Sequence, residues 1–251
     1  MRLVGLSIAF FNCMVQGLKE RDFIRDTFGR YVDPEIAKEL MNRPGASRLG
    51  GEKRKVAILM SDIRGFTTIA EELAPERVIA VLNKHFGLMI DIIQEYKGII
   101  VDFFGDGILV FFDPLDRPLK DYALNAVNCG VRMLQGVTKL NREMEDENLP
   151  PFEVGIGVNV GEVVVGNIGS HARAKYGIVG AAVNMVHRIQ SEAKGGELVI
   201  SEPVYALVGS SFEVERTFIV RMKGLAHSHK LYVVKINGHR EERESNSAPG
   251  L

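Results

Sequence analysis

Residues 99–112 read IIVDFFGDGILVFF, in which two short apolar runs, Ile99–Phe104 and Ile108–Phe112, are separated by Gly-Asp-Gly at 105–107. A break of this composition between two β-prone runs predicts a hairpin of antiparallel strands. Upstream, the run KVAILMS at residues 55–61 predicts a buried central strand, because its interior is apolar without alternation. A strand followed by a hairpin indicates a sheet at the core of the fold.

The segments beside these strands carry helical periodicity. Pro75 opens a run with apolar residues at helical spacing that stops at Gly98, and a second helix is expected over about residues 120–147. The order strand, helix, hairpin, helix, strand is the split βαβ pattern of ferredoxin-like sheets. We therefore predict an α+β fold built on such a sheet.

The rest of the body adds elements to that sheet. Residues 153–160 and 162–168 are expected to form a second hairpin that turns at or near Gly161. A helix over about 180–193 follows, and then alternating short strands continue to Val234. These later strands are expected to extend the ferredoxin-like core.

The ends of the chain differ from this body. We expect a helical connector for signalling or dimerisation over 1–45, a catalytic body over 46–236, and a polar, disordered tail over 237–251. A linker-like stretch over 42–55 spans the boundary between the connector and the body. Residues 3–18 are largely apolar but shorter than the roughly 20 residues that a membrane span needs. They are interpreted as an amphipathic dimerising helix, with the stub of a longer membrane segment as the alternative.

Composition excludes several classes of protein. The 31 Lys and Arg oppose 32 Asp and Glu, so the net charge is −1 and no nucleic-acid partner is expected. The two cysteines, Cys13 and Cys129, are too few for a disulfide framework or a metal cluster and suit a reducing cytosol. We expect a cytoplasmic protein, with tethering to the inner face of a membrane in a longer native chain left open.

Two carboxylates stand where predicted strands end. Asp62 follows the strand at 55–61, and Asp106 lies at the tip of the hairpin. In a split βαβ sheet the first strand lies beside that hairpin, so both acids are expected at one edge of the sheet. Each acid alone is well explained as a turn residue. Together they predict a site for a hard cation such as Mg²⁺, and the amides around Gly65 would suit phosphates.

The helix over 180–193 is amphipathic. Its polar stripe, at helical spacing, consists of Asn184, His187, Arg188 and Ser191. Periodicity alone explains this stripe as a solvent face. Gly177 and Gly180, just before the helix, favour a closely approaching ligand instead.

From about residue 55 to residue 234 the chain resembles the class III nucleotide cyclases, the adenylate and guanylate cyclase family. The motifs that carry the resemblance are MSDIRGF at 60–66, FGDG at 104–107, VGEVVVGNIG at 160–169, and GAAVN at 180–184 with Arg188. Any one of them is weak, but four in family order are specific. The segment FGRYVDP at 28–34 also resembles the connector that links many bacterial cyclase domains to sensors.

The resemblance implies conversion of ATP or GTP to the 3',5'-cyclic monophosphate and pyrophosphate, in a head-to-tail homodimer with active sites between the subunits. One subunit would bind two Mg²⁺ or Mn²⁺ ions per site through Asp62, Asp106 and the Ile63 carbonyl. The adjoining substrate-binding residues would be Gly65, Phe66 and Thr67.

The other subunit is expected to complete each site. The resemblance assigns Asn184 to the ribose, Arg188 to the charge of the transition state, and Lys223 to the phosphates. The connector implies an upstream sensor or membrane domain as a further partner.

Three positions depart from the family pattern. Asp102 stands four residues before Asp106, where adenylate-specific members carry Lys and guanylate-specific members carry Glu; Gly177 replaces Thr or Asp of adenylate-specific members. A carboxylate suits the N1 and N2 donors of guanine, although it also accepts from an exocyclic amine. ATP is ranked slightly ahead of GTP as the family default, with GTP or a relaxed pocket as alternatives. Glu162 stands where some members carry a phosphate-binding Arg.

Other functions fit less well. A catalytically silent cyclase-like module, acting in dimerisation or partner binding, would be expected to lack the acids or the Asn184 and Arg188 pair, and all four are present. A diguanylate cyclase would carry Gly-Gly followed by two acids and Phe on the hairpin, and that signature is absent. His227 and His229 are interpreted as exposed loop residues.

Overall fold

The computed structural model describes residues 49–113, 117–170, 172–221 and 227–236. The predicted connector over 1–45, the predicted tail over 237–251 and Lys223 lie outside the described residues. Among the helices that are described, none is long and apolar enough to cross a membrane.

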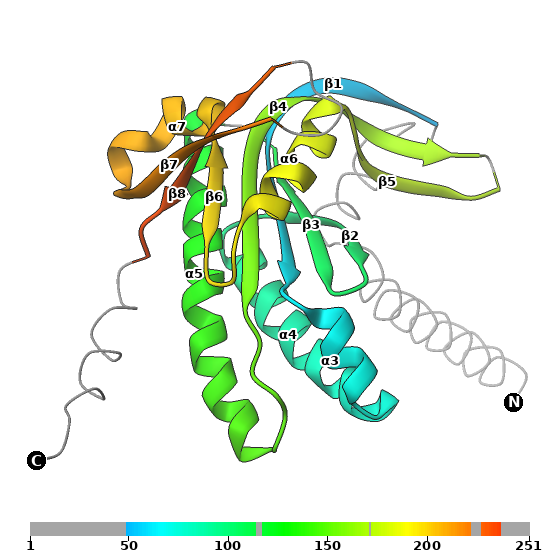
Figure 1. Ribbon diagram of the computed structural model, residues 1–251. Coiled ribbons are helices and arrows are strands. Elements are labelled where there is room, and N and C mark those ends of the chain that lie inside the picture. Colours follow the sequence, from blue (N-terminus) through cyan, green and yellow to red (C-terminus); the bar gives the residue numbers. More distant parts are fainter. Residues whose placement is uncertain (1–48, 114–116, 171, 222–226, 237–251) are drawn as a thin grey trace, which may run out of the picture. The chain divides into compact units, whose positions relative to one another are not determined.

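A mixed sheet of eight strands forms the centre of the described unit (Figure 1). The strands are β1 (Gly50–Ile63), β2 (Ile99–Phe104), β3 (Gly107–Phe112), β4 (Val154–Gly169), β5 (Ala174–Val179), β6 (Leu198–Ser201), β7 (Val214–Val220) and β8 (His229–Val234). Their order in the sheet is β2-β3-β1-β4-β6-β8-β7, and β5 pairs with β4. The segment β2-β3-β1-β4 is the predicted ferredoxin-like core, and the later strands β6, β7 and β8 extend it as expected. β5 was not predicted, and residues 202–208, expected among short strands, form a helix.

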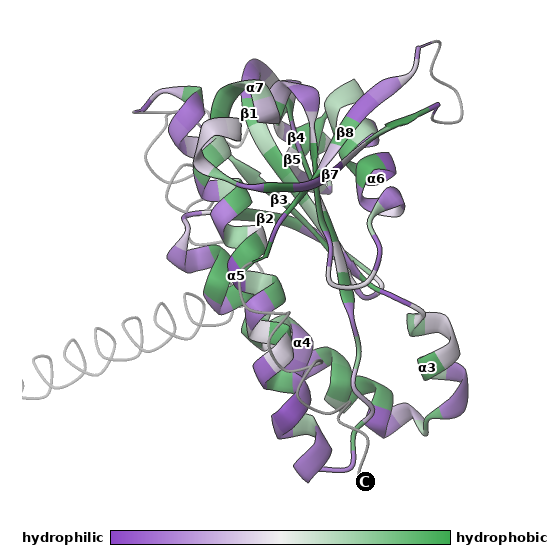
Figure 2. Cartoon of the chain, turned by 60° about the vertical axis from the view of Figure 1, so that its left-hand side comes forward, coloured by the Kyte–Doolittle hydropathy of each residue, from purple (hydrophilic) through white to green (hydrophobic). Residues whose placement is uncertain are grey.

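The helices lie on both faces of this sheet. They are α3 (Phe66–Glu72), α4 (Pro75–Glu95), α5 (Leu119–Asp146), α6 (Ala181–Glu192) and α7 (Glu202–Val208), followed by the short 3₁₀ helix η1 (Gly209–Ser211). Buried residues of α4, α5 and α7 form the main core on one face, and α6 packs on the other. Figure 2 shows the strands as largely hydrophobic, whereas α4 and α5 also carry hydrophilic residues.

The apolar run within β1 is continuous because both faces of this strand are covered. Ala57 and Leu59 belong to the core under α4 and α5, whereas Val56, Ile58 and Met60 belong to the core under α6. β1 pairs antiparallel with both β3 and β4. β1, which carries Asp62 near its end, is therefore hydrogen-bonded along both edges and packed on both faces.

The predicted second hairpin at Gly161 is wrong. Residues 154–169 form one strand, β4, which turns back only before β5. Gly161 lies within this strand, opposite Val56 of β1. A Cβ at Gly161 would lie 2.6 Å from the Cβ of Ala182, so the glycine admits the start of α6 and does not form a turn.

Two smaller predictions are also corrected. Residues 50–55, expected as part of a linker, form the first half of β1, because they pair with the far half of β4 from Gly50 opposite Asn167 onward. His229, expected in an exposed loop, is half-buried and opens β8, whereas His227 is exposed.

Candidate active site

The two predicted metal ligands lie together at the end of β1. Asp62 is the next-to-last residue of this strand, and Asp106 lies in the turn between β2 and β3. The Asp106 Oδ2 accepts a hydrogen bond of 2.8 Å from the Ile63 amide. A Cβ on Gly107 would lie 3.2 Å from Asp62 Oδ1, so this glycine leaves room for the Asp62 carboxylate. The predicted pairing of the acids is therefore present in a single chain.

The environment of the pair favours a cation. Burial, the side-chain hydrogen bond with Asp106 and the charge of Asp106 raise the pKa of Asp62 to about 7, and the nearby Arg64 opposes that rise. A divalent ion would relieve both the burial of charge and the repulsion between carboxylates. No group of three or more His, Cys, Asp or Glu side chains suited to a metal occurs in the part of the chain that the structure describes. The pair and the Ile63 carbonyl are all oxygen donors, which suit Mg²⁺ or Mn²⁺.

The turn after the acid is open at its amides. Gly65 adopts a left-handed φ of 68° and precedes α3, and no side chain among the described residues caps the start of that helix. Thr67 is exposed, whereas Phe66 is half-buried against the main core. The first-turn amides and Thr67 are thus accessible to a ligand, while the Phe66 ring serves in packing.

Asn184 and Arg188 lie one turn apart on α6. Val186 and Ile189 of the same helix are fully buried, so the polar stripe faces away from the sheet as predicted. Asn184 is exposed, and Arg188 is half-buried. The Arg188 Nη1 is buried and has no hydrogen-bond partner among the described residues. An unsatisfied buried guanidinium nitrogen is costly, so the Arg188 side chain would gain hydrogen bonds by turning outward to a ligand or a second chain.

Among the described residues of one chain, the two halves of the predicted site are not bonded directly to each other. In the part of the chain that the structure describes, no hydrogen bond or ion pair joins Asn184 or Arg188 to Asp62 or Asp106. Lys223 lies outside the described residues. Glu162 is exposed on β4 opposite Lys55 of β1, so it has an oppositely charged neighbour across the strands.

The two predicted base-reading positions, Asp102 and Gly177, lie on strands that an ion pair to Lys175 connects. The sequence analysis did not identify Lys175. Asp102 on β2 forms an ion pair with Lys175 on β5, and both side chains are partly exposed. Asp102 also accepts a 3.0 Å hydrogen bond from the Phe103 amide. Two residues beyond Lys175, a Cβ on Gly177 would lie 3.3 Å from Val101 Cγ1, so β5 lies closely against β2. Lys175 is 73 residues from Asp102, and only the turn of β5 onto β2 brings them together.

Four further residues near the acids were not anticipated. Arg64 donates a 2.8 Å hydrogen bond to the Gln190 carbonyl on α6. Gly155 and Gly157 of β4 lie directly under these two residues. The one available signal was the spacing of Gly-Ile-Gly at 155–157, because alternate residues of a strand share a face and two glycines there indicate close approach.

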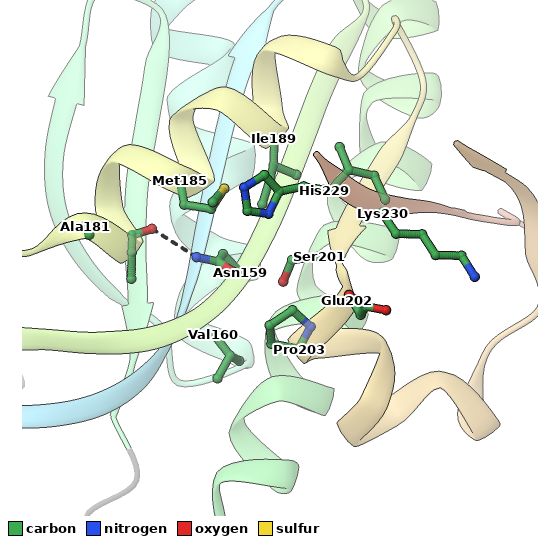
Figure 3. A pocket seen from close by; sticks show the side chains of 12 residues that line it. Asn159, Val160, Ala181, Met185, Ile189, Ser201, Glu202, Pro203, His229 and Lys230 are labelled. Carbon is green, nitrogen blue, oxygen red and sulfur yellow. Dashed lines mark hydrogen bonds between the residues drawn. The ribbon is translucent and has the colours of Figure 1, made fainter. Parts of the chain in front are cut away.

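A hollow lies beside α6 (Figure 3). It holds about 330 Å³ and is lined by residues of α6, β4, β8 and the junction between β6 and α7. Asn159 crosses it and donates a 3.1 Å hydrogen bond to the Ala182 carbonyl. The Ser201 hydroxyl is buried without a partner among the described residues. None of the predicted site residues lines this hollow.

Comparisons with known proteins agree with this architecture. Residues 51–236 match the model of the adenylate and guanylate cyclase catalytic domain. Two uncharacterised proteins of Mycobacterium tuberculosis are 34% identical over 193 residues and 37% identical over 188 residues. These alignments cover 76% and 73% of this chain but 34% and 32% of the relatives, so the chain spans about a third of their length.

Solved structures give the same family. The crystal structure of the guanylyl cyclase Cya2 is similar with a TM-score of 0.72 and 43% identity, over 77% of this chain and 98% of that one. The adenylyl cyclase CyaB from P. aeruginosa is similar with a TM-score of 0.71 and 33% identity, over 74% of this chain and 96% of that one. With the acid pair at the end of β1 and the polar stripe of α6 in place, the chain belongs to the adenylate and guanylate cyclase family.

Proposed function

We propose that the chain converts a purine nucleoside triphosphate to its 3',5'-cyclic monophosphate and pyrophosphate, at sites shared between two copies of the chain. The observation that carries this proposal is the position of Asp62 beside Asp106 at the end of β1, where burial and then the neighbouring Asp106 carboxylate raise the pKa of Asp62 to about 7. Two half-buried carboxylates side by side without a compensating cation are unfavourable. Family membership supplies the reaction class.

The reaction needs positioning and charge stabilisation more than a protein nucleophile. The ribose 3'-oxygen attacks the α-phosphorus and gives its proton to solvent water, while the bond from the α-phosphorus to the bridging oxygen breaks and pyrophosphate leaves. Asp62, Asp106 and the Ile63 carbonyl would hold two Mg²⁺ or Mn²⁺ ions, which when bound lower the pKa of the attacking hydroxyl and offset the phosphate charge.

The remaining roles fall to α6 and the turn after β1. Arg188 would turn its guanidinium, whose Nη1 is buried and unpartnered among the described residues of one chain, toward the charge that develops on the phosphate. Asn184, one turn earlier and exposed, would hold the ribose so that the 3'-oxygen is aligned for attack. The amides after Gly65 and the Thr67 hydroxyl would bind phosphate oxygens. Lys223 is proposed to do the same from the second chain.

A head-to-tail homodimer would bring these halves together. Among the described residues, no hydrogen bond or ion pair joins the acids to Asn184 or Arg188 of the same chain, and we infer that α6 of a second copy completes the site. Five large apolar side chains on β2 and the β4–β5 pair are more than a third exposed, namely Phe103, Phe104, Val164, Ile168 and Val179. An exposed apolar surface of this kind suits a partner chain. Asp102 and Lys175, where the base would enter, lie on the same strands β2 and β5 as three of these side chains.

The Asp102–Lys175 pair bears on the choice of base. A carboxylate beside an ammonium presents an acceptor and a donor, and each retains free bonding capacity after pairing. Guanine offers N1 and N2 donors to the carboxylate and O6 to the ammonium, whereas adenine offers one donor and one acceptor. One additional bond to a charged group is worth about 1.5 kcal/mol or more, which is about tenfold in selectivity. We therefore place GTP ahead of ATP, reversing the ranking from the sequence; the 43% identity to a guanylyl cyclase supports this order.

The test is product formation by the purified full chain with ATP, GTP, CTP and UTP separately, under Mg²⁺ and then Mn²⁺. We expect cyclic GMP to form fastest, and Asp62→Asn or Asp106→Asn to abolish turnover. Lys175→Ala should reduce the preference for GTP, while Lys230→Ala, a matched lysine on β8, should leave it unchanged. Absence of any cyclic product from a confirmed dimer would refute the proposal in favour of a catalytically silent module.

A further inference from the structure

Arg64 links the acid-bearing end of β1 to α6. It follows Asp62 by two residues, and its amide donates a 2.8 Å hydrogen bond to the Glu153 carbonyl. Its guanidinium Nη2 donates a 2.8 Å hydrogen bond to the Gln190 carbonyl in the last turn of α6. Gln190 lies two residues after Arg188. One side chain therefore spans from the proposed metal ligands to the helix of the proposed transition-state residue.

Two glycines of β4, Gly155 and Gly157, allow Arg64 and Gln190 to lie close to the strand. A Cβ at Gly155 would lie 2.3 Å from Arg64 Nε, and a Cβ at Gly157 would lie 2.6 Å from the backbone nitrogen of Gln190. Gln190 is held a second time, because its Nε2 donates a 3.3 Å hydrogen bond to the Gly155 carbonyl. Any side chain at either glycine would lift the arginine or the helix from the strand.

The electrostatics favour an arginine at this place. The carboxyl-terminal end of a helix carries partial negative charge, which a guanidinium stabilises. The charge of Arg64 also acts on Asp62, where it opposes the rise in pKa caused by burial and by Asp106. The Arg64 Nε is buried without a partner among the described residues. This arrangement costs stability relative to a solvated arginine, so general stabilisation is a poor explanation for it.

We propose that Arg64 is a positioning residue that fixes α6 to the acid-bearing loop of its own chain and thereby couples the two active sites of the dimer. The coupling rests on the proposed function, in which α6 of each chain serves the acids of the other. A shift of α6 in one chain would misplace Arg188 in one site, and the accompanying shift of the loop would misplace Asp62 in the other. Arg64 connects these two movements within one chain.

The test uses mixed dimers that contain a single complete site. An Asp62→Asn chain and an Arg188→Ala chain are co-expressed with different tags and purified as the mixed dimer. Its working site takes the acids from the Arg188→Ala chain and α6 from the Asp62→Asn chain. Arg64→Ala is then introduced into either chain in turn. Arg77→Ala, which removes an exposed arginine that donates to the Asn148 carbonyl, is the matched control.

We expect Arg64→Ala to reduce kcat about tenfold whichever chain carries it, since displacements well below 1 Å are sufficient for such a loss. The KM for the nucleotide should change little, and Arg64→Lys should recover part of kcat. Arg64→Met, which keeps the apolar stem, guards against a loss that comes only from unfolding. Thermal melts of all variants should stay near that of the parent.

Three results would overturn parts of this inference. A loss confined to the chain that supplies the acids would mean that Arg64 acts on Asp62 alone. No loss in either chain would remove the positioning role. An inactive mixed dimer in which both Arg64 side chains are native would instead overturn the shared site on which the coupling rests.

Discussion

Replacing Gly157 with alanine should displace α6 and reduce catalysis without unfolding the protein. The added Cβ would lie 2.6 Å from the Gln190 nitrogen and 2.8 Å from the Gln190 Cα. These are backbone atoms, so no side-chain rotation relieves the clash. Ordinary contact needs about 3.5 Å, so the helix and the strand must separate by about 0.9 Å.

The strand is the less able of the two to move. β4 is hydrogen-bonded to β1 on one side and to β6 on the other, whereas α6 is held by packing and a few hydrogen bonds. We therefore expect α6 to shift and to carry Asn184 and Arg188 with it. A misplacement near 1 Å costs about 100-fold in rate, and overpacking of this kind costs about 1–3 kcal/mol in stability.

The assay combines kcat at saturating nucleotide and Mn²⁺ with urea unfolding. Gly87→Ala is the matched control: this glycine lies within α4 and has no atom within 4 Å of an added Cβ, so stability should rise by about 0.5–1 kcal/mol with kcat unchanged. Native kcat in Gly157→Ala, with or without a loss of stability, would refute the view that the position of α6 sets the rate.

Three further outcomes follow from individual residues. Mg²⁺ or Mn²⁺ should raise the melting temperature more at pH 8 than at pH 6, because protons compete with the metal for Asp62 below its pKa of about 7. Without metal, Asp62 should lower the free energy of unfolding as pH rises from about 4 to about 7, because in that range Asp62 keeps its proton only in the folded state. An equal metal effect at both pH values would contradict this. His85 is fully buried, and this burial lowers its pKa to about 4 against the opposing effect of the neighbouring Asp106. As pH falls, His85 therefore takes up a proton in the unfolded chain before it does so in the folded one, and the free energy of unfolding decreases between about pH 6.5 and about pH 4. His85→Leu should lessen this decrease in urea titrations, and an identical pH dependence of the unfolding free energy in the two proteins would disprove it. Asp113→Asn should cost about 3 kcal/mol because it breaks the buried ion pair with Arg54, while Lys235→Gln, which breaks the exposed pair with Glu213, should barely move the urea midpoint; similar losses in both would show that burial is not the deciding factor.

Several elements were predictable because their signals are local. The hairpin over 99–112 followed from Gly-Asp-Gly between two β-prone runs, and α4 followed from Pro75 and helical periodicity. The turn assigned to Gly161 was wrong because a glycine that makes a tight turn and a glycine that admits a neighbouring helix look alike in sequence. The helices α3 and α7 were missed because each has only seven residues, which is too short for a periodic pattern.

The sequence by itself determined the split βαβ order, the two acids at strand ends and the polar stripe of α6, because each depends on spacing along the chain. Only the tertiary structure decided that Lys175 pairs with Asp102 and that Arg64 reaches α6. These relations join residues 73 and 126 positions apart. Contacts at such separations depend on how β4 and β5 run across the sheet and how closely α6 approaches β4, and no local pattern encodes either.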